Sequence, residues 1–110
     1  FEVNLYIYQQ AGRVWLEKRP NKGIWAGLYS FPEHARLDVA EGTDRLLRIR
    51  HVLTHRVLHL QPHVFQLTAS QAHELEDTET ATQGGWFNVS EAQKVGLPKP
   101  ILELVLSVLG

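Results

Sequence analysis

The N-terminal segment restricts the possible folds most strongly. Apolar and more polar side chains alternate along it, with Val3, Leu5 and Ile7 on one side and Glu2, Asn4 and Tyr6 on the other. This period of two is typical of a β-strand with one buried face. After a turn near Gly12, Val14 and Leu16 repeat the pattern, which predicts a hairpin over residues 2–19.

The next segment, residues 20–33, combines helix-breaking residues with large apolar ones. Its breakers are Pro20, Gly23, Gly27 and Pro32. Too many aromatic side chains lie between them for a disordered linker, so we expect a packed loop that leads into a short strand at residues 28–31. Residues 39–48 then predict a short helix, with Thr43 as its N-cap and with Leu46 and Leu47 facing inward.

Residues 51–69 are rich in Val, Leu, Phe and Thr, which is the composition of β-strands. Pro62 has no amide hydrogen to donate, so it argues against a helix, and we expect two strand segments with a break or bulge at Gln61–Pro62. The polar and acidic residues 69–85 predict a solvated loop, and residues 86–89 predict a last strand.

Two helices are predicted to close the chain. Ser90 is the candidate N-cap of the first. The second begins at about Pro98 and is apolar at Ile101, Leu102, Leu104, Val105, Val108 and Leu109. Together the elements predict one α+β domain over residues 1–110, with a mixed or antiparallel sheet and flanking helices.

The composition limits the kinds of site that the chain can hold. It contains no cysteine, which excludes disulfides, thiolate zinc sites, iron–sulfur ligation and a cysteine nucleophile within this segment. A formal net charge of -1 is not that of an autonomous nucleic-acid-binding domain, so any DNA contact is expected to be local and assisted. No apolar run reaches the roughly 18 residues of a membrane helix. The chain starts within a strand pattern and has no signal peptide, so we expect it to be part of a longer protein.

Histidine recurs at every fourth position between residues 51 and 63, as His51, His55, His59 and His63. In a helix this spacing would stack the imidazoles and permit a shared zinc ion. In a strand, successive histidines lie about 13 Å apart, too far to share an ion that each nitrogen must approach to about 2 Å. Because the segment is predicted to be extended, we expect no metal site. His59 and His63 are expected to be half-buried strand residues, whereas His51 and His55 flank Thr54, which a loop could expose.

The segment around residues 18–33 resembles Nudix domains. A strand that ends in Lys18-Arg19, followed by Gly-Ile-Trp, Gly-Leu and Phe-Pro, is similar to the region before the Nudix signature. Gly27 and Glu33 fit the first spacing of that signature, whose glutamates hold the magnesium that assists diphosphate cleavage. The arginine and the glutamate cluster of its second half are absent, and Glu33, Glu41 and Asp44 are a poor remnant. The resemblance therefore implies a Nudix-like fold without its catalytic carboxylates.

A narrower resemblance spans essentially all of the chain. The segments RPNKGIWAGLYSFPE, HVLTH and GLPKPILELVLSVL together are similar to the C-terminal domain of the MutY family of adenine DNA glycosylases, which remove adenine mispaired with 8-oxoguanine. In that family a Phe-Ser-His tripeptide lies in a loop at the oxidised guanine, and its hydroxyl residue hydrogen-bonds the lesion. By this resemblance Leu53 takes the aromatic position, Thr54 the hydroxyl position and His55 the histidine position.

The chemistry of 8-oxoguanine is compatible with a hydroxyl contact. Oxidation converts N7 of guanine from an acceptor to an N–H donor and adds a carbonyl at C8. The hydroxyl of Thr54 can accept and donate, so it can bond to either new group. Leu53 can act as an apolar wedge but cannot stack as an aromatic ring does, and His55 could contact a phosphate. The alternative without function is that this tripeptide only begins a strand, with Leu53 in the core and Thr54 present as a residue that favours β-structure.

Basic residues are enriched near the tripeptide, whereas acidic residues gather at positions 74–79. This asymmetry favours a phosphate-facing side, for which the candidate contacts are Lys22, Arg50 and Arg56, although a run of charges is also typical of a solvated face. The aromatic residues could suggest a stacking platform, but they are spread through core-like segments, so we expect them to pack. This set comprises Trp15, Trp25, Tyr29, Phe31, Phe65, Trp86 and Phe87.

The resemblance implies a lesion-recognition domain of an adenine glycosylase in base excision repair. The catalytic residues and a [4Fe-4S] cluster would belong to an N-terminal domain outside this segment, so the segment alone is expected to be non-catalytic and metal-free. Its partners would be duplex DNA with 8-oxoguanine opposite adenine and its own catalytic domain, in the cytoplasm or nucleoid of a bacterial-type cell and away from membranes. Two alternatives stay open: a Nudix-type nucleotide pyrophosphohydrolase and a protein-interaction domain.

Overall fold

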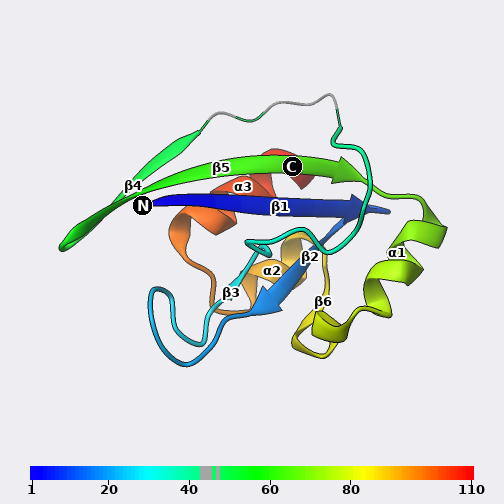
Figure 1. Ribbon diagram of the computed structural model, residues 1–110, viewed down its shortest axis with the longest axis horizontal. Helices are drawn as coiled ribbons and strands as arrows, with labels where there is room; N and C mark the ends of the chain where they lie inside the picture. The colour runs from blue at the N-terminus through cyan, green and yellow to red at the C-terminus, as the bar shows by residue number, and fades with distance from the viewer. Residues whose placement is uncertain (43–45, 47) are drawn as a thin grey trace.

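A mixed β-sheet forms the centre of the computed structural model, which describes residues 1–42, 46 and 48–110 (Figure 1). Among these residues the sheet has six strands, in the order β3-β2-β1-β5-β4, with β6 paired to β2. The strands are β1 (Glu2–Gln10), β2 (Arg13–Lys18), β3 (Tyr29–Ser30), β4 (Ile49–Leu53), β5 (Arg56–Gln66) and β6 (Gly84–Phe87). The helices are α1 (Ala69–Glu76), the 3-10 helix η1 (Glu79–Gln83), α2 (Val89–Gln93) and α3 (Lys99–Leu109).

The predicted N-terminal hairpin is confirmed as β1 and β2. Its turn residues Ala11 and Gly12 have φ of 53° and 75°. Two consecutive residues in the left-handed region give a turn whose twist matches that of the flanking strands. On its other edge, β1 pairs in parallel with β5, from Glu2 opposite His59 to Gln9 opposite Gln66. The sheet is therefore mixed, one of the two arrangements that the sequence predicted.

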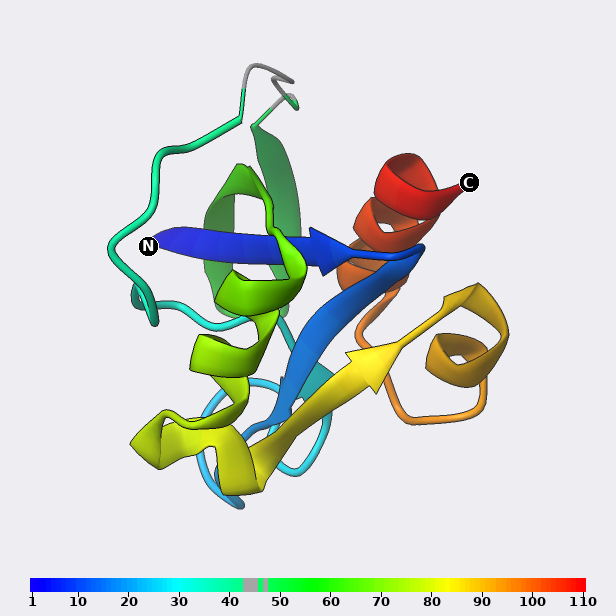
Figure 2. The same ribbon diagram turned by 90° about the vertical axis from the view of Figure 1, so that its right-hand side faces the viewer.

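Helices cover both faces of the sheet, as Figure 2 shows with α3 and α1 on opposite sides. On one face, strand residues such as Leu5, Leu16 and Leu60 pack with Ile101 and Leu104 of α3 in the first core cluster. On the other face, a second core cluster contains Tyr8, Trp15, Phe65, Leu67 and Leu75. Burial of each large apolar side chain contributes about 1.5–3 kcal/mol. This arrangement confirms the predicted α+β class with flanking helices.

The predicted break at Gln61–Pro62 is wrong, because β5 runs without interruption through Pro62. In a parallel ladder, alternate residues bond to alternate sides, and His59 donates its amide to Phe1 on the β1 side. Pro62 therefore points its nitrogen to the opposite side, where the pairing with β4 reaches no further than Leu60. A missing amide hydrogen costs nothing at this position.

Two further predictions fail at helix starts. The segment predicted to be a solvated loop contains α1 and η1, and α1 begins with a capping box in which Thr68 and Gln71 bond to each other's backbone amides. Helix α2 is capped by Asn88, which forms the same box with Glu91. Ser90, the predicted N-cap, is the second residue of that helix. In both cases the polar residue that caps the helix lies just after a strand, so the sequence pattern placed it in the predicted strand and not at the helix start.

The predicted helix at residues 39–48 is not supported where the structure describes it, since residues 39–42 are not helical. Its N-cap Thr43 and Leu47 lie outside the described residues, whereas Leu46 packs against the first core cluster. The short strand at residues 28–31 and the terminal helix after Pro98 are confirmed as β3 and α3. Across the described part of the chain, we find no helix with the length and apolar character needed to cross a membrane.

Candidate nucleic-acid interface

The tripeptide Leu53-Thr54-His55 lies at the turn of the β4–β5 hairpin. This hairpin projects from the left end of the molecule in Figure 1. Leu53, the last residue of β4, pairs with Arg56, the first residue of β5, so Thr54 and His55 form a two-residue turn. Both side chains are exposed, whereas Leu53 is partly buried and packs against the first core cluster. The turn therefore offers the hydroxyl of Thr54 and the imidazole of His55 to a ligand, and Leu53 anchors the turn to the core.

The two arginines predicted near this turn lie on opposite faces of the hairpin. Side chains alternate along a strand, so Arg50 lies on the face opposite to His51 and Leu53. Arg56 is paired with Leu53 and shares its face. Both arginines are exposed. Arg50 and Arg56 thus flank Thr54 on opposite faces of the hairpin, so a duplex must reach around the hairpin tip to contact both of them.

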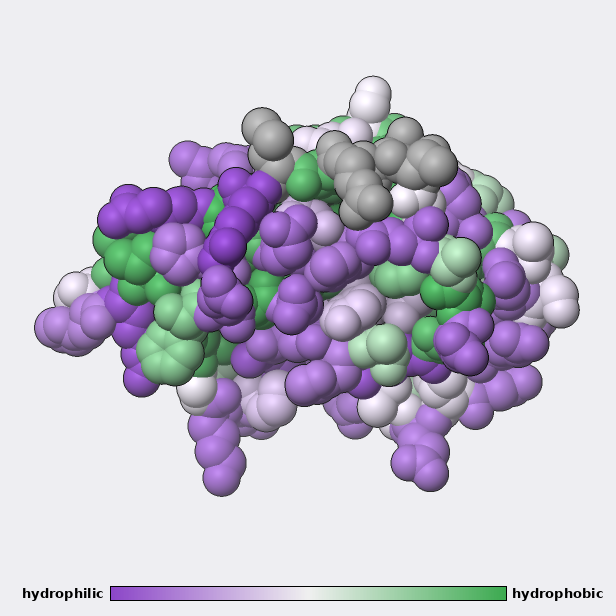
Figure 3. Space-filling view, turned by 45° about the horizontal axis from the view of Figure 1, so that its top comes forward, coloured by the Kyte–Doolittle hydropathy of each residue, from purple (hydrophilic) through white to green (hydrophobic). Residues whose placement is uncertain are grey.

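Exposed apolar side chains accompany the arginines at this end of the molecule. Phe1 is 69% exposed and Val52 is 59% exposed. The guanidinium carbon of Arg56 lies 4.8 Å from the centre of the Phe1 ring, a cation–π arrangement. Figure 3 shows apolar side chains gathered among polar ones over this end. A mixed apolar and cationic surface of this kind is suited to nucleobases and phosphates together.

The loop at residues 20–27 approaches the hairpin from β2. Lys22, the third predicted phosphate contact, is exposed on this loop. Trp25, three residues later, has φ of 58° and lies with its ring centre 6.0 Å from that of His51. The sequence did not identify the contact between Trp25 and His51, because a tryptophan in a left-handed conformation has no local signature.

The four histidines of residues 51–63 are spread along the β4–β5 hairpin. No group of three or more His, Asp or Glu side chains that could hold an ion occurs among the described residues. His51 and His55 lie in β4 and the turn, and His59 and His63 lie in β5. The ring nitrogens of His63 lie 3.0 Å from a carboxylate oxygen of Glu41 and 3.0 Å from the amide oxygen of Asn4. This histidine joins the segment before β4 to the sheet.

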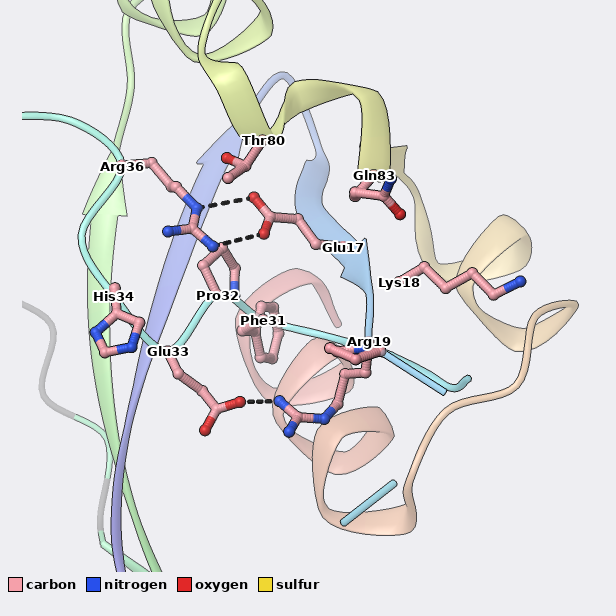
Figure 4. A pocket seen from close by; sticks show the side chains of 11 residues that line it. Glu17, Lys18, Arg19, Phe31, Pro32, Glu33, His34, Arg36, Thr80 and Gln83 are labelled. Atoms are coloured by element: carbon pink, nitrogen blue, oxygen red, sulfur yellow. Dashed lines mark hydrogen bonds and ion pairs between the residues drawn. The ribbon is translucent and has the colours of Figure 1, made fainter. Parts of the chain in front are cut away.

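A concave site, separate from the hairpin, lies beneath the loop at residues 31–36 (Figure 4). Its volume is about 350 Å³. Arg36 donates two hydrogen bonds to Glu17, at 2.8 and 3.1 Å, and Trp15 donates a third at 2.9 Å. The hydrogen bond to Glu17 raises the pKa of Arg36, whereas burial lowers the pKa of Arg19.

The carboxylates considered as a remnant of a magnesium site are engaged elsewhere. Glu33 forms an ion pair with Arg19 at the edge of the cavity (Figure 4). Glu41 pairs with His63 of β5. Asp44 lies outside the described residues. Glu33 and Glu17 are thus each neutralised by an arginine, which favours a structural role for these carboxylates over metal binding.

Comparison with known proteins identifies the family. Residues 3–107 match the family model of the NUDIX domain. The chain belongs to the NUDIX domain family. Two curated relatives of this NUDIX domain are adenine DNA glycosylases from subspecies of Buchnera aphidicola. That of subspecies Baizongia pistaciae is 25% identical over 113 residues, covering 93% of the chain and 31% of the relative. That of subspecies Acyrthosiphon pisum is 22% identical over 110 residues, covering 90% of the chain and 30% of the relative.

Solved structures agree with the NUDIX fold. The C-terminal domain of mouse MUTYH, solved in complex with human PCNA, aligns with a TM-score of 0.67 and 18% identity, covering 96% of this chain and 84% of that one. The solution structure of the E. coli ORF135 protein aligns with a TM-score of 0.61 and 19% identity, covering 97% and 89%. The NUDIX domain therefore spans about a third of the length of its curated glycosylase relatives and most of an excised C-terminal domain.

Proposed function

We propose that this NUDIX domain recognises 8-oxoguanine opposite adenine as part of an adenine DNA glycosylase acting in base excision repair. The observation that carries the proposal is the exposed position of Thr54, a hydroxyl-bearing residue, at the tip of a projecting hairpin. Similarity to adenine DNA glycosylases over 93% of the chain supports the same assignment. The alternative without function placed Leu53 in the core and Thr54 in a strand; Leu53 does pack against the core, whereas Thr54 lies in the turn between β4 and β5.

In this proposal the hairpin grips the lesion while another domain performs the chemistry. Extrusion of the adenine costs a few kcal/mol of unstacking and unpairing, and contacts to the opposite base help to hold the opened duplex. Thr54 bonds to the N7–H or the C8 carbonyl that distinguishes 8-oxoguanine from guanine. His55, Lys22, Arg50 and Arg56 contact phosphates around it.

Catalysis and metal chemistry belong, in the same proposal, to the remaining length of the protein. A [4Fe-4S] cluster needs four thiolate ligands, and this chain contains no cysteine. The cluster and the residues that cleave the glycosidic bond are therefore assigned to a separate catalytic domain, which would also be this domain's partner. The proposed place of action is inside a bacterial-type cell, at the chromosome.

The decisive experiment separates the hydroxyl of Thr54 from its shape. In the full-length protein, Thr54→Val keeps the volume and removes the hydroxyl, whereas Thr54→Ser keeps the hydroxyl. Affinity is measured for two duplexes that differ only in 8-oxoguanine or guanine opposite a non-hydrolysable adenine nucleotide. We expect Thr54→Val to reduce the preference for the lesion by about tenfold, the worth of one good hydrogen bond, and Thr54→Ser to retain most of it.

The same experiment can contradict the proposal. An unchanged preference in Thr54→Val would remove its chemical basis and favour a protein-interaction domain. Magnesium-dependent release of phosphate or pyrophosphate from 8-oxo-dGTP, lost in Glu33→Gln, would favour a nucleotide pyrophosphohydrolase instead.

A further inference from the structure

A tryptophan ring from a different segment of the chain lies against β4, the strand that leads to the proposed lesion contact. The ring centres of Trp25 and His51 lie 6.0 Å apart, with 50° between the ring planes. His51 and Leu53 are two residues apart in β4, so their side chains share a face of the sheet. The indole of Trp25 therefore lies beside the strand end that leads into Thr54.

The loop holds Trp25 in a fixed and unusual conformation. Its φ of 58° is in the left-handed region, which residues other than glycine rarely adopt. The amide of Gly27 donates to the carbonyl of Pro20 at 3.0 Å, and the amide of Leu28 donates to the carbonyl of Trp25 at 3.0 Å. A strained residue persists only where its surroundings determine its conformation, and such residues cluster at functional sites. The loop thus presents the indole at a defined position.

The indole is suited to contact a ligand as well as to pack. Trp25 packs against the first core cluster but stays partly exposed. Lys22, exposed on the same loop, adds a positive charge for a phosphate. An aromatic face beside a cation is the usual means of binding an unstacked nucleotide. Leu53 cannot provide such a face, because it has no ring.

We propose that Trp25 is a further DNA-contacting residue, which stacks on a nucleobase next to the lesion bound by Thr54. This inference rests on the proposed function, and it adds a different kind of contact. Stacking tolerates any base, so Trp25 strengthens binding to lesion-containing and undamaged duplexes alike. Thr54, by contrast, distinguishes between them.

The test compares three variants of the full-length protein on the two duplexes described above. Trp25→Leu removes the ring but stays apolar, and Trp25→Phe keeps a ring. Trp86→Leu is the matched control, since Trp86 is also partly buried and packs against Trp15 with ring centres 5.3 Å apart, away from the hairpin. We expect Trp25→Leu to weaken binding to both duplexes by about tenfold, and Trp25→Phe and Trp86→Leu to stay within about threefold of the wild type.

A second measurement covers the case in which Trp25→Leu does not fold. The wild-type protein is labelled with 5-fluorotryptophan, and the resonance missing in Trp25→Phe is assigned to Trp25. We expect this resonance to shift when duplex is added, and that of Trp86 to stay in place. A static Trp25 resonance overturns the inference, as does wild-type affinity in Trp25→Leu or an equal loss in Trp25→Phe.

The results also separate this inference from the function on which it rests. If Thr54→Val keeps the full preference for the lesion, the proposed function fails whatever Trp25 does. If Thr54→Val loses the preference while Trp25→Leu binds both duplexes like the wild type, only the role of Trp25 is wrong.

Discussion

The guanidinium of Arg36 donates two hydrogen bonds to the carboxylate of Glu17, at 2.8 and 3.1 Å. Glu17 is 8% exposed, so its charge is largely removed from water. The backbone amide of Arg36 also donates a hydrogen bond to the hydroxyl of Tyr8, at 2.8 Å. Together, the ion pair with Glu17 and the hydrogen bond to Tyr8 attach the loop at residues 31–36 to the second core cluster.

Removal of Arg36 should therefore destabilise the domain strongly. We expect Arg36→Ala to lower the free energy of unfolding by about 3 kcal/mol, because it leaves a buried carboxylate without its cation. Urea denaturation measures the loss. The matched control is Arg48→Ala, whose partner Glu2 is on the surface, and it should leave the urea midpoint almost unchanged. Equal losses in the two variants would contradict the role assigned to burial.

Ionisation of Tyr8 should limit stability at high pH. Burial raises the pKa of the Tyr8 phenol above its ordinary value of about 10. A raised folded-state pKa contributes stability that is fully present below the unfolded pKa and is lost as the pH rises through the folded pKa. We expect the advantage of the wild type over Tyr8→Phe to be constant from about pH 7 to pH 9 and to begin to fall above about pH 10. A difference that stays constant up to pH 11 would show that the phenol does not titrate with unfolding.

The true cap of α2 can be distinguished from the predicted one by mutation. The side chain of Asn88 accepts a hydrogen bond from the amide of Glu91 at 2.8 Å, whereas Ser90 lies exposed within the helix. Asn88→Ala should lower the free energy of unfolding by about 1 kcal/mol. Ser90→Ala, a similar truncation two residues away, should have little effect in the same thermal denaturation series. A larger loss in Ser90→Ala would restore the original prediction.

Phosphate contacts at the hairpin should appear in the salt dependence of DNA binding. Each lysine or arginine that neutralises a phosphate changes the slope of log K against log salt concentration by about 0.9. We therefore expect Arg50→Ala and Arg56→Ala each to reduce the slope by about 1 in fluorescence-anisotropy titrations of the full-length protein. Arg13→Ala is the control, because Arg13 is exposed beside the β1–β2 turn at the other end of β1. If only one of the two hairpin arginines changes the slope, the duplex contacts a single face of the hairpin.

Local patterns in the sequence predicted the elements whose signals are local. The alternation from Val3 to Ile7 and the apolar face of α3 were sufficient for the β1–β2 hairpin and the last helix. Helix α1 was missed because its apolar face is small, with Ala72 and Leu75 as its buried residues, although the spacing of Thr68 and Gln71 indicates a capping box.

The features that depend on distant residues were not predictable from one sequence. Continuity of β5 through Pro62 depends on which of its edges faces β4, which only the assembled sheet determines. The contact of Trp25 with His51 and the pairing of Arg36 with Glu17 likewise join separate segments. The turn at Thr54 was inferred as exposed from a family resemblance, since a threonine between β-formers has no turn signal of its own.

The parallel pairing of β1 with β5 also determines the order of events during synthesis. The β1–β2 hairpin is complete after about twenty residues, but the partner of its free edge extends to Gln66. During translation, β1 must therefore keep one unpaired edge until β5 has left the ribosome, and pairings between distant segments form slowly. The nascent chain is most exposed to aggregation in this interval, and substitutions that weaken β5 should reduce the yield of folded protein before they affect the stability of the finished domain.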